Sequence, residues 1–317
     1  MRAKNLFNFA FIMIAAMTLI LAGCSKDKTT EKGTTNTESM QQMTQDNNNV
    51  MNAADQIIAD ANTVLIQSST LKSGKFGGGP CNTTVTVGNV INDSITVDIE
   101  YHGYDCPKKH IRTGHILIKR KYQEPWGTPG ATVILTLNNF TITKVPNGKT
   151  LILNGRKHYQ NVSGHYMWEL DSTMNVTSIE HKIWGAVTAT FEDNTARVWY
   201  IARQHIFTGK LSNYTLVHTT DGLGSADGYN SLETWGTTRA GEKFYTQITQ
   251  SVVNKMACNW DPCSGVVIHQ IPAASKSATI TFGYDSNNNL ITNGDCPTRY
   301  RVDWVNGSTS GTFFLPL

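Results

Sequence analysis

Charged residues are scarce in this chain, and neither sign of charge dominates. Only 16% of the 317 residues are charged, with 27 Lys and Arg against 24 Asp and Glu, a formal net charge of +3. Nucleic-acid-binding domains carry clustered basic residues, so this composition argues against a nucleic-acid partner. The sequence also lacks a Gly-x-Ser-x-Gly elbow, a His-Glu-x-x-His motif and a phosphate-binding loop, so motifs assign no reaction.

The one pronounced apolar run covers residues 9–21. It follows Arg2 and Lys4 and leads into Leu21-Ala22-Gly23-Cys24. A basic start, a short apolar segment and small residues before a cut site are typical of a secretory signal, and the run is shorter than the about 20 residues that span a bilayer. The order Leu-Ala-Gly-Cys resembles the lipobox of bacterial lipoproteins, which are cut before the cysteine and acylated on it. The alternatives are an ordinary signal peptide or a short buried helix.

We therefore expect residues 1–23 to be a removed signal peptide and Cys24 to carry acyl chains such as palmitate. Several acyl chains give stable attachment, so the exported protein would be a membrane-anchored lipoprotein of the cell envelope. Ser25 is not the aspartate that retains lipoproteins in the inner membrane of enteric bacteria, which by analogy favours the outer membrane. Whether the anchor lies on the periplasmic or the surface-exposed side stays open.

Five cysteines remain after Cys24. In an exported protein, disulfides are the default expectation, and an odd number leaves at least one cysteine unpaired within the chain. The favoured pairs are Cys81 with Cys106 and Cys258 with Cys296, although spacing alone does not determine connectivity. The segment from Cys258 to Cys263 lacks the spacing of a zinc knuckle, so we expect no metal and no cofactor.

The region before the main body divides into two parts. Residues 24–49 are rich in Thr, Asn, Gln, Ser and Lys, which predicts a flexible tether. Residues 50–80 contain apolar side chains at three- and four-residue steps, which predict an amphipathic helix over residues 51–67, and then a glycine-rich linker. Asp55 and Asp60 stand where a helix on a membrane surface would carry Lys or Arg, so we expect this helix to pack on the body.

Residues 81–317 alternate between apolar and polar positions, for example over residues 131–137. This period of two, with turns such as Asn306-Gly307 between the runs, is typical of half-buried strands joined by hairpins. The predicted fold class is all-β: an antiparallel, hairpin-rich meander of about fourteen to seventeen strands. It would form a large twisted open sheet or a sandwich, preceded by one short helix. A strand followed by Asp-Cys-Pro occurs at both Asp105 and Asp295, which either two related halves or chance would explain.

Several segments appear in a characteristic order after the lipobox, tether and helix. They are residues 81–87, 112–118, 137–142, 257–260 and 281–284, followed by Gly294-Asp295-Cys296. This order resembles a widespread set of uncharacterised lipoproteins of Bacteroidota. The resemblance implies export, anchoring and β architecture, and it transfers no catalytic residue. The sequence departs from the set in Pro107 and in the extra Cys263.

Few residues suggest chemistry, and each has a simpler explanation. Asp98 and Glu100 share a strand face, as an acid–base pair would, but carboxylates two apart on a strand usually belong to a solvated polar face. The nine histidines show no metal-ligand spacing. The segment from Asp285 to Asn289 copies the first oxygen ligands of a calcium loop, yet Leu290 replaces the turn glycine, which favours a polar hairpin turn.

Seven tryptophans give the strongest indication of a ligand site. Trp184 and Trp199 fall opposite the apolar phase of their strands, which around Trp199 runs through Val198 and Tyr200. Trp235 does the same if its two neighbours face inward. A row of these three rings on one sheet face would stack on sugars or line an acyl-chain groove. The simpler explanation, which the usual burial of tryptophan favours, is that these rings fill the core.

These features predict an envelope lipoprotein whose β domain is a non-enzymatic binding or structural module of unknown ligand. An acyl chain as ligand predicts an exposed apolar trough, whereas a glycan predicts coplanar tryptophans flanked by Asp, Asn or Gln. The alternative is a hydrolase acting on envelope polysaccharide or lipid, which requires carboxylates or histidines converging in one pocket. A mechanical spacer, which predicts no well-formed pocket, stays open as well.

The lipidation prediction can be checked directly with Cys24→Ser. Because the thiol is the acylation site, the variant should accumulate as an unprocessed precursor without acyl chains. Metabolic labelling with a palmitate analogue measures this, and equal label on both proteins would contradict the prediction.

Overall fold

The computed structural model describes residues 37–68, 74–76, 79–146, 148–171 and 175–317, so the predicted signal peptide and Cys24 lie outside the described residues. The helix is α1 (Thr37–Ser68), and the first eight strands are β1 (Gly74–Phe76), β2 (Thr83–Val87), β3 (Ser94–Tyr104), β4 (His110–Lys121), β5 (Ala131–Lys144), β6 (Thr150–Asn161), β7 (Ser178–Thr190) and β8 (Ala196–Thr208). The later strands are β9 (Val217–Gly222), β10 (Gly224–Ala226), β11 (Tyr229–Thr237), β12 (Lys243–Lys255), β13 (Pro262–Ile271), β14 (Lys276–Tyr284), β15 (Arg299–Asn306) and β16 (Thr309–Pro316). Short 3-10 turns are η2 (Met167–Asp171), η3 (Met256–Cys258) and η4 (Pro272–Ala274).

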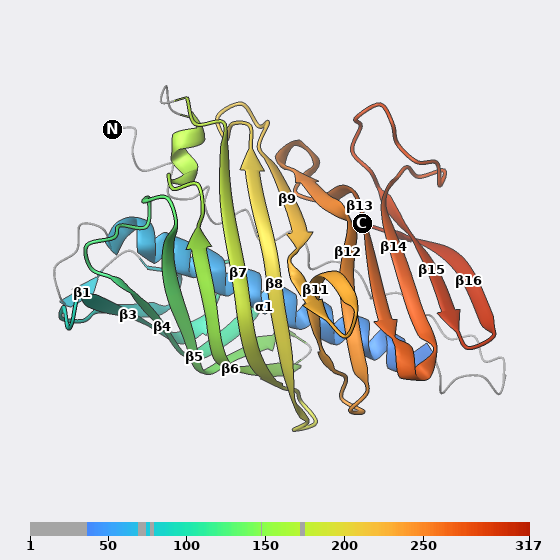
Figure 1. The fold of residues 1–317 in the computed structure, drawn as a ribbon, viewed down its shortest axis with the longest axis horizontal. Coiled ribbons are helices and arrows are strands. Elements are labelled where there is room, and N and C mark those ends of the chain that lie inside the picture. Colours follow the sequence, from blue (N-terminus) through green and yellow to red (C-terminus); the bar gives the residue numbers. More distant parts are fainter. Residues whose placement is uncertain (1–36, 69–73, 77–78, 147, 172–174) are drawn as a thin grey trace.

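All these strands belong to one antiparallel sheet of 16 strands. From β1 to β8 each strand pairs with the next along the chain, and after β8 the order continues from β11 to β16. Strand β9 pairs with β8 and β12, and β10 pairs with β11. The predicted all-β, antiparallel, hairpin-rich fold is confirmed, and it takes the form of one large sheet (Figure 1).

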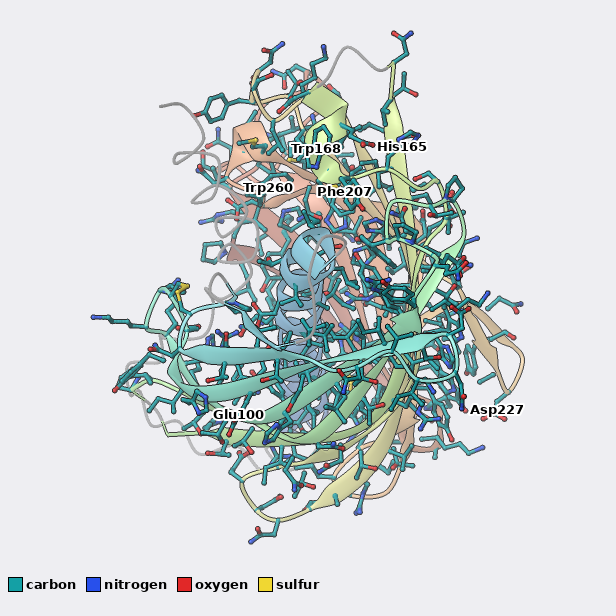
Figure 2. All side chains as sticks on the ribbon, turned by 90° about the vertical axis from the view of Figure 1, so that its left-hand side faces the viewer. Glu100, His165, Trp168, Phe207, Asp227 and Trp260 are labelled. Carbon is teal, nitrogen blue, oxygen red and sulfur yellow. A yellow bond between two sulfur atoms is a disulfide. The ribbon has the colours of Figure 1, made fainter. Side chains whose placement is uncertain are left out.

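Helix α1 lies across one face of the sheet, and the sheet curls around it (Figures 1 and 2). We call the face against α1 the inner face and the opposite one the outer face. The main core joins buried helix residues to inner-face residues, among them Val50, Ile57, Val64, Ile99, Ile116, Leu135, Tyr159, Ile183 and Trp199. Because successive strand residues point to opposite faces, each of these contacts also fixes which neighbours lie outside.

The helix extends farther toward the amino terminus than the sequence predicted. It covers Thr37–Ser68 rather than residues 51–67, so the prediction of a flexible tether is wrong for residues 37–49. Two of the polar residues that suggested disorder are buried in the helix–sheet interface. Asp46 accepts two hydrogen bonds from Arg239, and Asn47 accepts one from the Thr234 hydroxyl. Pairing across the interface thus adds to the burial of Met43, which packs into the main core.

Two glycines in neighbouring strands allow tight backbone contact where the sheet curves. Gly155 of β6 has a φ of 142° and Gly185 of β7 has a φ of 152°, values that side chains disfavour. A Cβ on Gly185 would lie 2.3 Å from the carbonyl oxygen of Arg156, and a Cβ on Gly155 would lie 2.5 Å from that of Ala186. Glycine is therefore required at both positions, as is common where two backbones approach closely.

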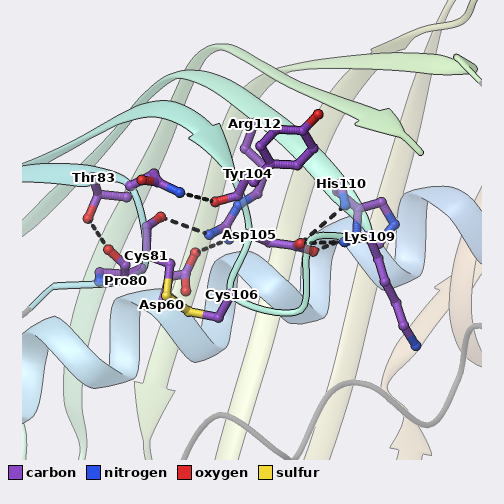
Figure 3. The surroundings of a disulfide bond; sticks show 11 residues. Asp60, Pro80, Cys81, Thr83, Tyr104, Asp105, Cys106, Lys109, His110 and Arg112 are labelled. Carbon is purple, nitrogen blue, oxygen red and sulfur yellow. Dashed lines mark hydrogen bonds and ion pairs between the residues drawn. A yellow bond between two sulfur atoms is a disulfide. The ribbon is translucent and has the colours of Figure 1, made fainter. Parts of the chain in front are cut away.

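Three aspartates of α1 each meet an arginine from the sheet or its loops. The pairs are Asp46–Arg239, Asp55–Arg203 and Asp60–Arg112. The Asp60 carboxylate also accepts a hydrogen bond of 2.7 Å from the Tyr101 hydroxyl. Figure 3 shows Asp60 and Arg112 beside the first disulfide, with Arg112 reaching the carbonyl oxygen of Cys81 at 3.5 Å. Removing one member of a buried pair leaves an uncompensated charge, so these pairs hold α1 in one register against the sheet.

Two disulfides connect the turns at the ends of the strands. They join Cys81 to Cys106 and Cys258 to Cys296, the pairs that the sequence favoured, and Cys263 is free. No helix within the described ranges is both long and apolar enough to cross a membrane.

Arg112→Met tests the importance of the buried pairs. It should lower the free energy of unfolding by about 3–5 kcal/mol, because it leaves the Asp60 carboxylate buried without its partner. Lys243→Met is a matched control, since it breaks an exposed pair with Asp227 and should have little effect. Urea denaturation followed by circular dichroism measures both variants. Equal stabilities of Arg112→Met and the wild type would show that Arg112 is not needed to compensate the buried Asp60 carboxylate.

Candidate functional site

A group of charged side chains lies on the inner face against α1. Arg203 of β8 pairs with Asp55 of the helix and, at 3.3 Å, with Glu233 of β11. Lys157 of β6 is 0% exposed, and its Nζ has no hydrogen-bond partner among the described residues. Burial, together with the charge of Arg203, lowers the pKa of Lys157 to about 7. Because this group lies between helix and sheet, we assign it to the stability of that interface.

Three histidines extend this group along the inner face: His181 in β7, His205 in β8 and His218 in β9. Burial lowers the pKa of each imidazole, to about 3 for His181 and to about 4 for His218. A hydrogen bond of 2.9 Å joins His181 to the Tyr159 hydroxyl, and His218 stacks on Phe207 at 4.6 Å. These rings are therefore neutral and packed at pH 7. Within the described part of the chain, no three His, Cys, Asp or Glu side chains form a group that could hold a metal ion.

The two carboxylates that the sequence singled out lie on the outer face of β3. Asp98 Oδ2 is 3.2 Å from Nδ1 of His115, and Glu100 Oε2 is 3.8 Å from Nε2 of His102. All four side chains are exposed to solvent by a third or more. They form a solvated polar face, which is the simpler of the two explanations that the sequence allowed.

The segment that imitates a calcium loop is a polar turn between β14 and β15. The Asp285 carboxylate accepts hydrogen bonds of 2.8 Å from the backbone N–H groups of Asn287 and Asn289. Beside it lies an open hollow of about 330 Å³, whose lining includes Asn293 and Asp295. Because one oxygen of Asp285 already accepts two backbone donors, it stabilises the turn.

The outer face carries three aromatic rings that we define as the aromatic surface: the exposed Trp184 of β7 and Tyr200 of β8, and the half-buried Trp235 of β11. Their chain neighbours Ile183 and Trp199 are buried in the core on the inner face, which places Trp184 and Tyr200 outside. Trp184 is 36% exposed and Tyr200 is 43% exposed. Two of the three tryptophans predicted to form a platform, Trp184 and Trp235, therefore share the outer face.

For Trp199 the platform hypothesis is wrong, and the simpler explanation that it fills the core is confirmed. This side chain is 0% exposed, packs on Phe244 with 4.5 Å between ring centroids, and donates from Nε1 to the carbonyl oxygen of Thr237 at 3.0 Å. Strand β8 is apolar on both faces, so alternation alone does not show which phase is buried. Tyr200 takes the outer position that the sequence had assigned to Trp199.

The rings of the aromatic surface lie nearly parallel in pairs. Trp184 stacks with His158 of β6 at 5.2 Å and an interplanar angle of 6°, and Tyr200 stacks with Trp235 at 5.4 Å and 13°. Tyr200 and Trp235 are direct cross-strand partners. Tyr200 and Trp184 are not, because the residue opposite Tyr200 on β7 is Ala186, two positions from Trp184. The rings therefore form two stacked pairs in adjacent register rows of the same face, with Trp184 diagonal to Tyr200.

Trp235 is fixed in this surface by close contacts. A Cβ on Gly224 of β10 would lie 2.3 Å from its ring, so glycine at that position lets the hairpin lie against Trp235. Its other cross-strand partner, Tyr245, stacks with Tyr229 at 4.3 Å, and its hydroxyl donates a hydrogen bond to the Asp227 carboxylate. Burial and the adjacent Asp227 carboxylate raise the pKa of Tyr245 to about 12. The ring of Trp235 is thus held by packing before any ligand arrives.

Sequence analysis missed Tyr200 and His158 as members of this surface. Both belong to it through cross-strand register, since His158 is opposite Trp184 and Tyr200 is opposite Trp235. Register depends on turn lengths and bulges between strands, which alternation within one strand does not show. The available signal was the second apolar phase of β8, which placed Val198 and Tyr200 together on one face.

We compared the chain with protein-family models, with curated proteins and with solved structures, and none of these matches it. The resemblance to Bacteroidota lipoproteins stays a prediction. Function has to be inferred from the amino-terminal sequence and from the geometry of the outer face.

Lys157→Met tests the cost of burying an amine in the helix–sheet interface. Folding lowers the pKa of Lys157 from 10.5 to about 7, so between these pH values the unfolded chain binds more protons at this residue than the folded chain. The stability of the wild type should therefore rise with pH in this window, by up to about 1.4 kcal/mol per pH unit from this group.

The variant should be more stable than the wild type at pH 7 and should lack this contribution to the slope. Urea denaturation at several values from pH 7 to about 9.5 measures it. The exposed control Lys210→Met should keep the wild-type slope. If the free energies of unfolding of the wild type and Lys157→Met change in parallel with pH, Lys157 is not the cause of the rise in stability.

Proposed function

We propose that this chain is a membrane-anchored envelope lipoprotein, held by acyl chains on Cys24, whose β domain binds a glycan without transforming it. The anchor rests on the sequence around Cys24, and the outer membrane is the proposed location. The observation that carries the binding role is the aromatic surface: Trp184 and Tyr200 are exposed on the outer face, and Tyr200 stacks nearly parallel to the half-buried Trp235.

Large apolar side chains seldom lie exposed next to one another on one face of a sheet. A soluble surface gains by burying such groups, so contiguous exposed apolar patches commonly mark interaction sites. The C–H faces of a pyranose ring are apolar and flat, while its hydroxyl groups point sideways. Aromatic rings side by side on a sheet therefore offer stacking positions for successive sugars, and ring orientation restricts how they lie.

Polar side chains border the aromatic surface on the same face. Gln270 of β13 is opposite Tyr245 and donates from its side-chain amide to Gln247 at 2.9 Å. The Asp227 carboxylate accepts a hydrogen bond from the Tyr245 hydroxyl. Amides and carboxylates beside aromatic rings are the arrangement that a glycan site predicts, because sugar hydroxyls both donate and accept hydrogen bonds.

The acyl-chain ligand and the hydrolase stay predictions from the sequence. The binding assay separates them from the proposal, since an acyl-chain protein would bind fatty acids and a hydrolase would release new reducing ends from a polysaccharide. For this purpose the mature chain is produced in soluble form with Cys24→Ser, keeping all of α1, because the helix begins at Thr37.

Trp184→Ala and Tyr200→Ala should each weaken binding to envelope polysaccharides about tenfold, since each removes a stacking ring. Affinity electrophoresis in gels containing cell-envelope polysaccharide fractions measures the loss. Trp168→Ala is the matched control, because Trp168 is 48% exposed but lies on η2 rather than in the aromatic surface. Equal retardation of the wild type, Trp184→Ala and Tyr200→Ala would contradict the proposal. An effect of Trp168→Ala as large as that of these two variants would contradict it as well.

A further inference from the structure

Two cationic side chains lie beside the aromatic surface without a partner. Lys119 of β4 and Arg156 of β6 are both exposed, and neither side chain forms a hydrogen bond or ion pair with another described residue. Their neighbours Ile118 and Lys157 are buried on the inner face, which places both cations on the outer face with the rings.

Strand register brings Arg156 next to the aromatic surface. Arg156 is opposite Ala186, which is opposite Tyr200, so this cation lies in the same row as Tyr200 and Trp235. Trp184 is two residues from Ala186 on β7, which makes it the diagonal neighbour of Arg156 at about 7–8 Å. A guanidinium group on a long side chain covers that distance.

Lys119 belongs to the adjacent row. It is opposite Ile134, which is opposite His158, the stacking partner of Trp184. Lys119 is thus three strands from Trp184, about 14 Å at the usual strand spacing. The two cations therefore lie on the Trp184 side of the aromatic surface, Arg156 as its diagonal neighbour and Lys119 three strands away.

The carboxylates around this end already have partners. Asp98 lies in the row of Arg156 but three strands away, where His115 contacts it at 3.2 Å. Glu180 is four residues along β7 from Trp184 and is 3.3 Å from Nζ of Lys182. Arg156 is therefore a cation next to the rings without a carboxylate to neutralise it.

We infer that the glycan bound by this surface carries carboxylated sugars, with one sugar stacked on Trp184 and a neighbouring carboxylate bound by Arg156. This inference rests on the proposed glycan-binding function and adds the chemical class of the ligand. The planar guanidinium group donates two parallel hydrogen bonds to a carboxylate, and Lys119 adds a second positive charge for an acidic sugar farther along the glycan. An uncharged glycan would leave both cations unused.

The test compares two polymers of the same sugar that differ in charge: polygalacturonate and its fully methyl-esterified form. The soluble mature chain should bind the charged polymer at least tenfold more tightly, and about 0.5 M salt should remove most of the difference. Arg156→Gln should weaken binding to polygalacturonate about three- to tenfold and leave binding to the ester unchanged. Lys119→Gln should act in the same direction, and the exposed control Lys210→Gln should do neither.

Each other outcome overturns the inference. Equal affinity for both polymers, or an equal effect of Arg156→Gln on both, would show that charge is not recognised. If neither polymer binds but a neutral polysaccharide does, with Trp184→Ala weakening it, the proposed function stands and the inference about charge fails. If no polysaccharide of either kind binds, both fail together.

Discussion

The rest of the structure depends on the burial of α1 against the curled sheet, fixed by aspartate–arginine pairs along the helix. A single open sheet with apolar residues on one face needs an element that covers that face, because these residues would otherwise be exposed to solvent. Helix α1 covers these residues, but apolar burial is non-directional and by itself does little to fix the position of the helix along the sheet. Charged pairs fix that position, because a displaced helix would separate Asp55 from Arg203 and leave the buried Asp46 and Asp60 without their arginines.

Fixing the inner face determines the outer one. Once Trp199, Ile201 and Arg203 are directed toward α1, the pleat forces Tyr200 outward, and the same argument applies to Trp184 in β7. The aromatic surface is therefore a consequence of how the core is built, and its rigidity comes from strands that are paired on both sides. Tight backbone contacts at Gly155 and Gly185 contribute by allowing neighbouring strands to curve together.

Much of the fold could be predicted from sequence, because alternation and turn residues are local signals. The antiparallel all-β class follows from them, and the structure contains the cysteine pairs that were favoured. The start of α1 could not be predicted, because the residues that extend it, Asp46 and Asn47, are held by Arg239 and Thr234 from far along the chain. Trp199 was placed on the wrong face for a related reason. Both phases of β8 are apolar, and only the contact with Phe244 and the helix decides between them.

The same reasoning about partners separates the arginines of the two faces. Arg112, Arg203 and Arg239 lie against α1, and each has a carboxylate that compensates for the loss of water around it. Arg156 is one residue away from this interface, since its neighbour Lys157 is fully buried, yet its own side chain faces solvent beside the aromatic surface. A hydrated cation needs no protein partner for the fold to be stable, so the fold does not explain its place beside Trp184. A binding surface requires hydrogen-bond donors that the fold does not use and apolar rings that the fold leaves exposed. Arg156 and Trp184 meet these two requirements, and a ligand that displaces the water around them would be stabilised by both.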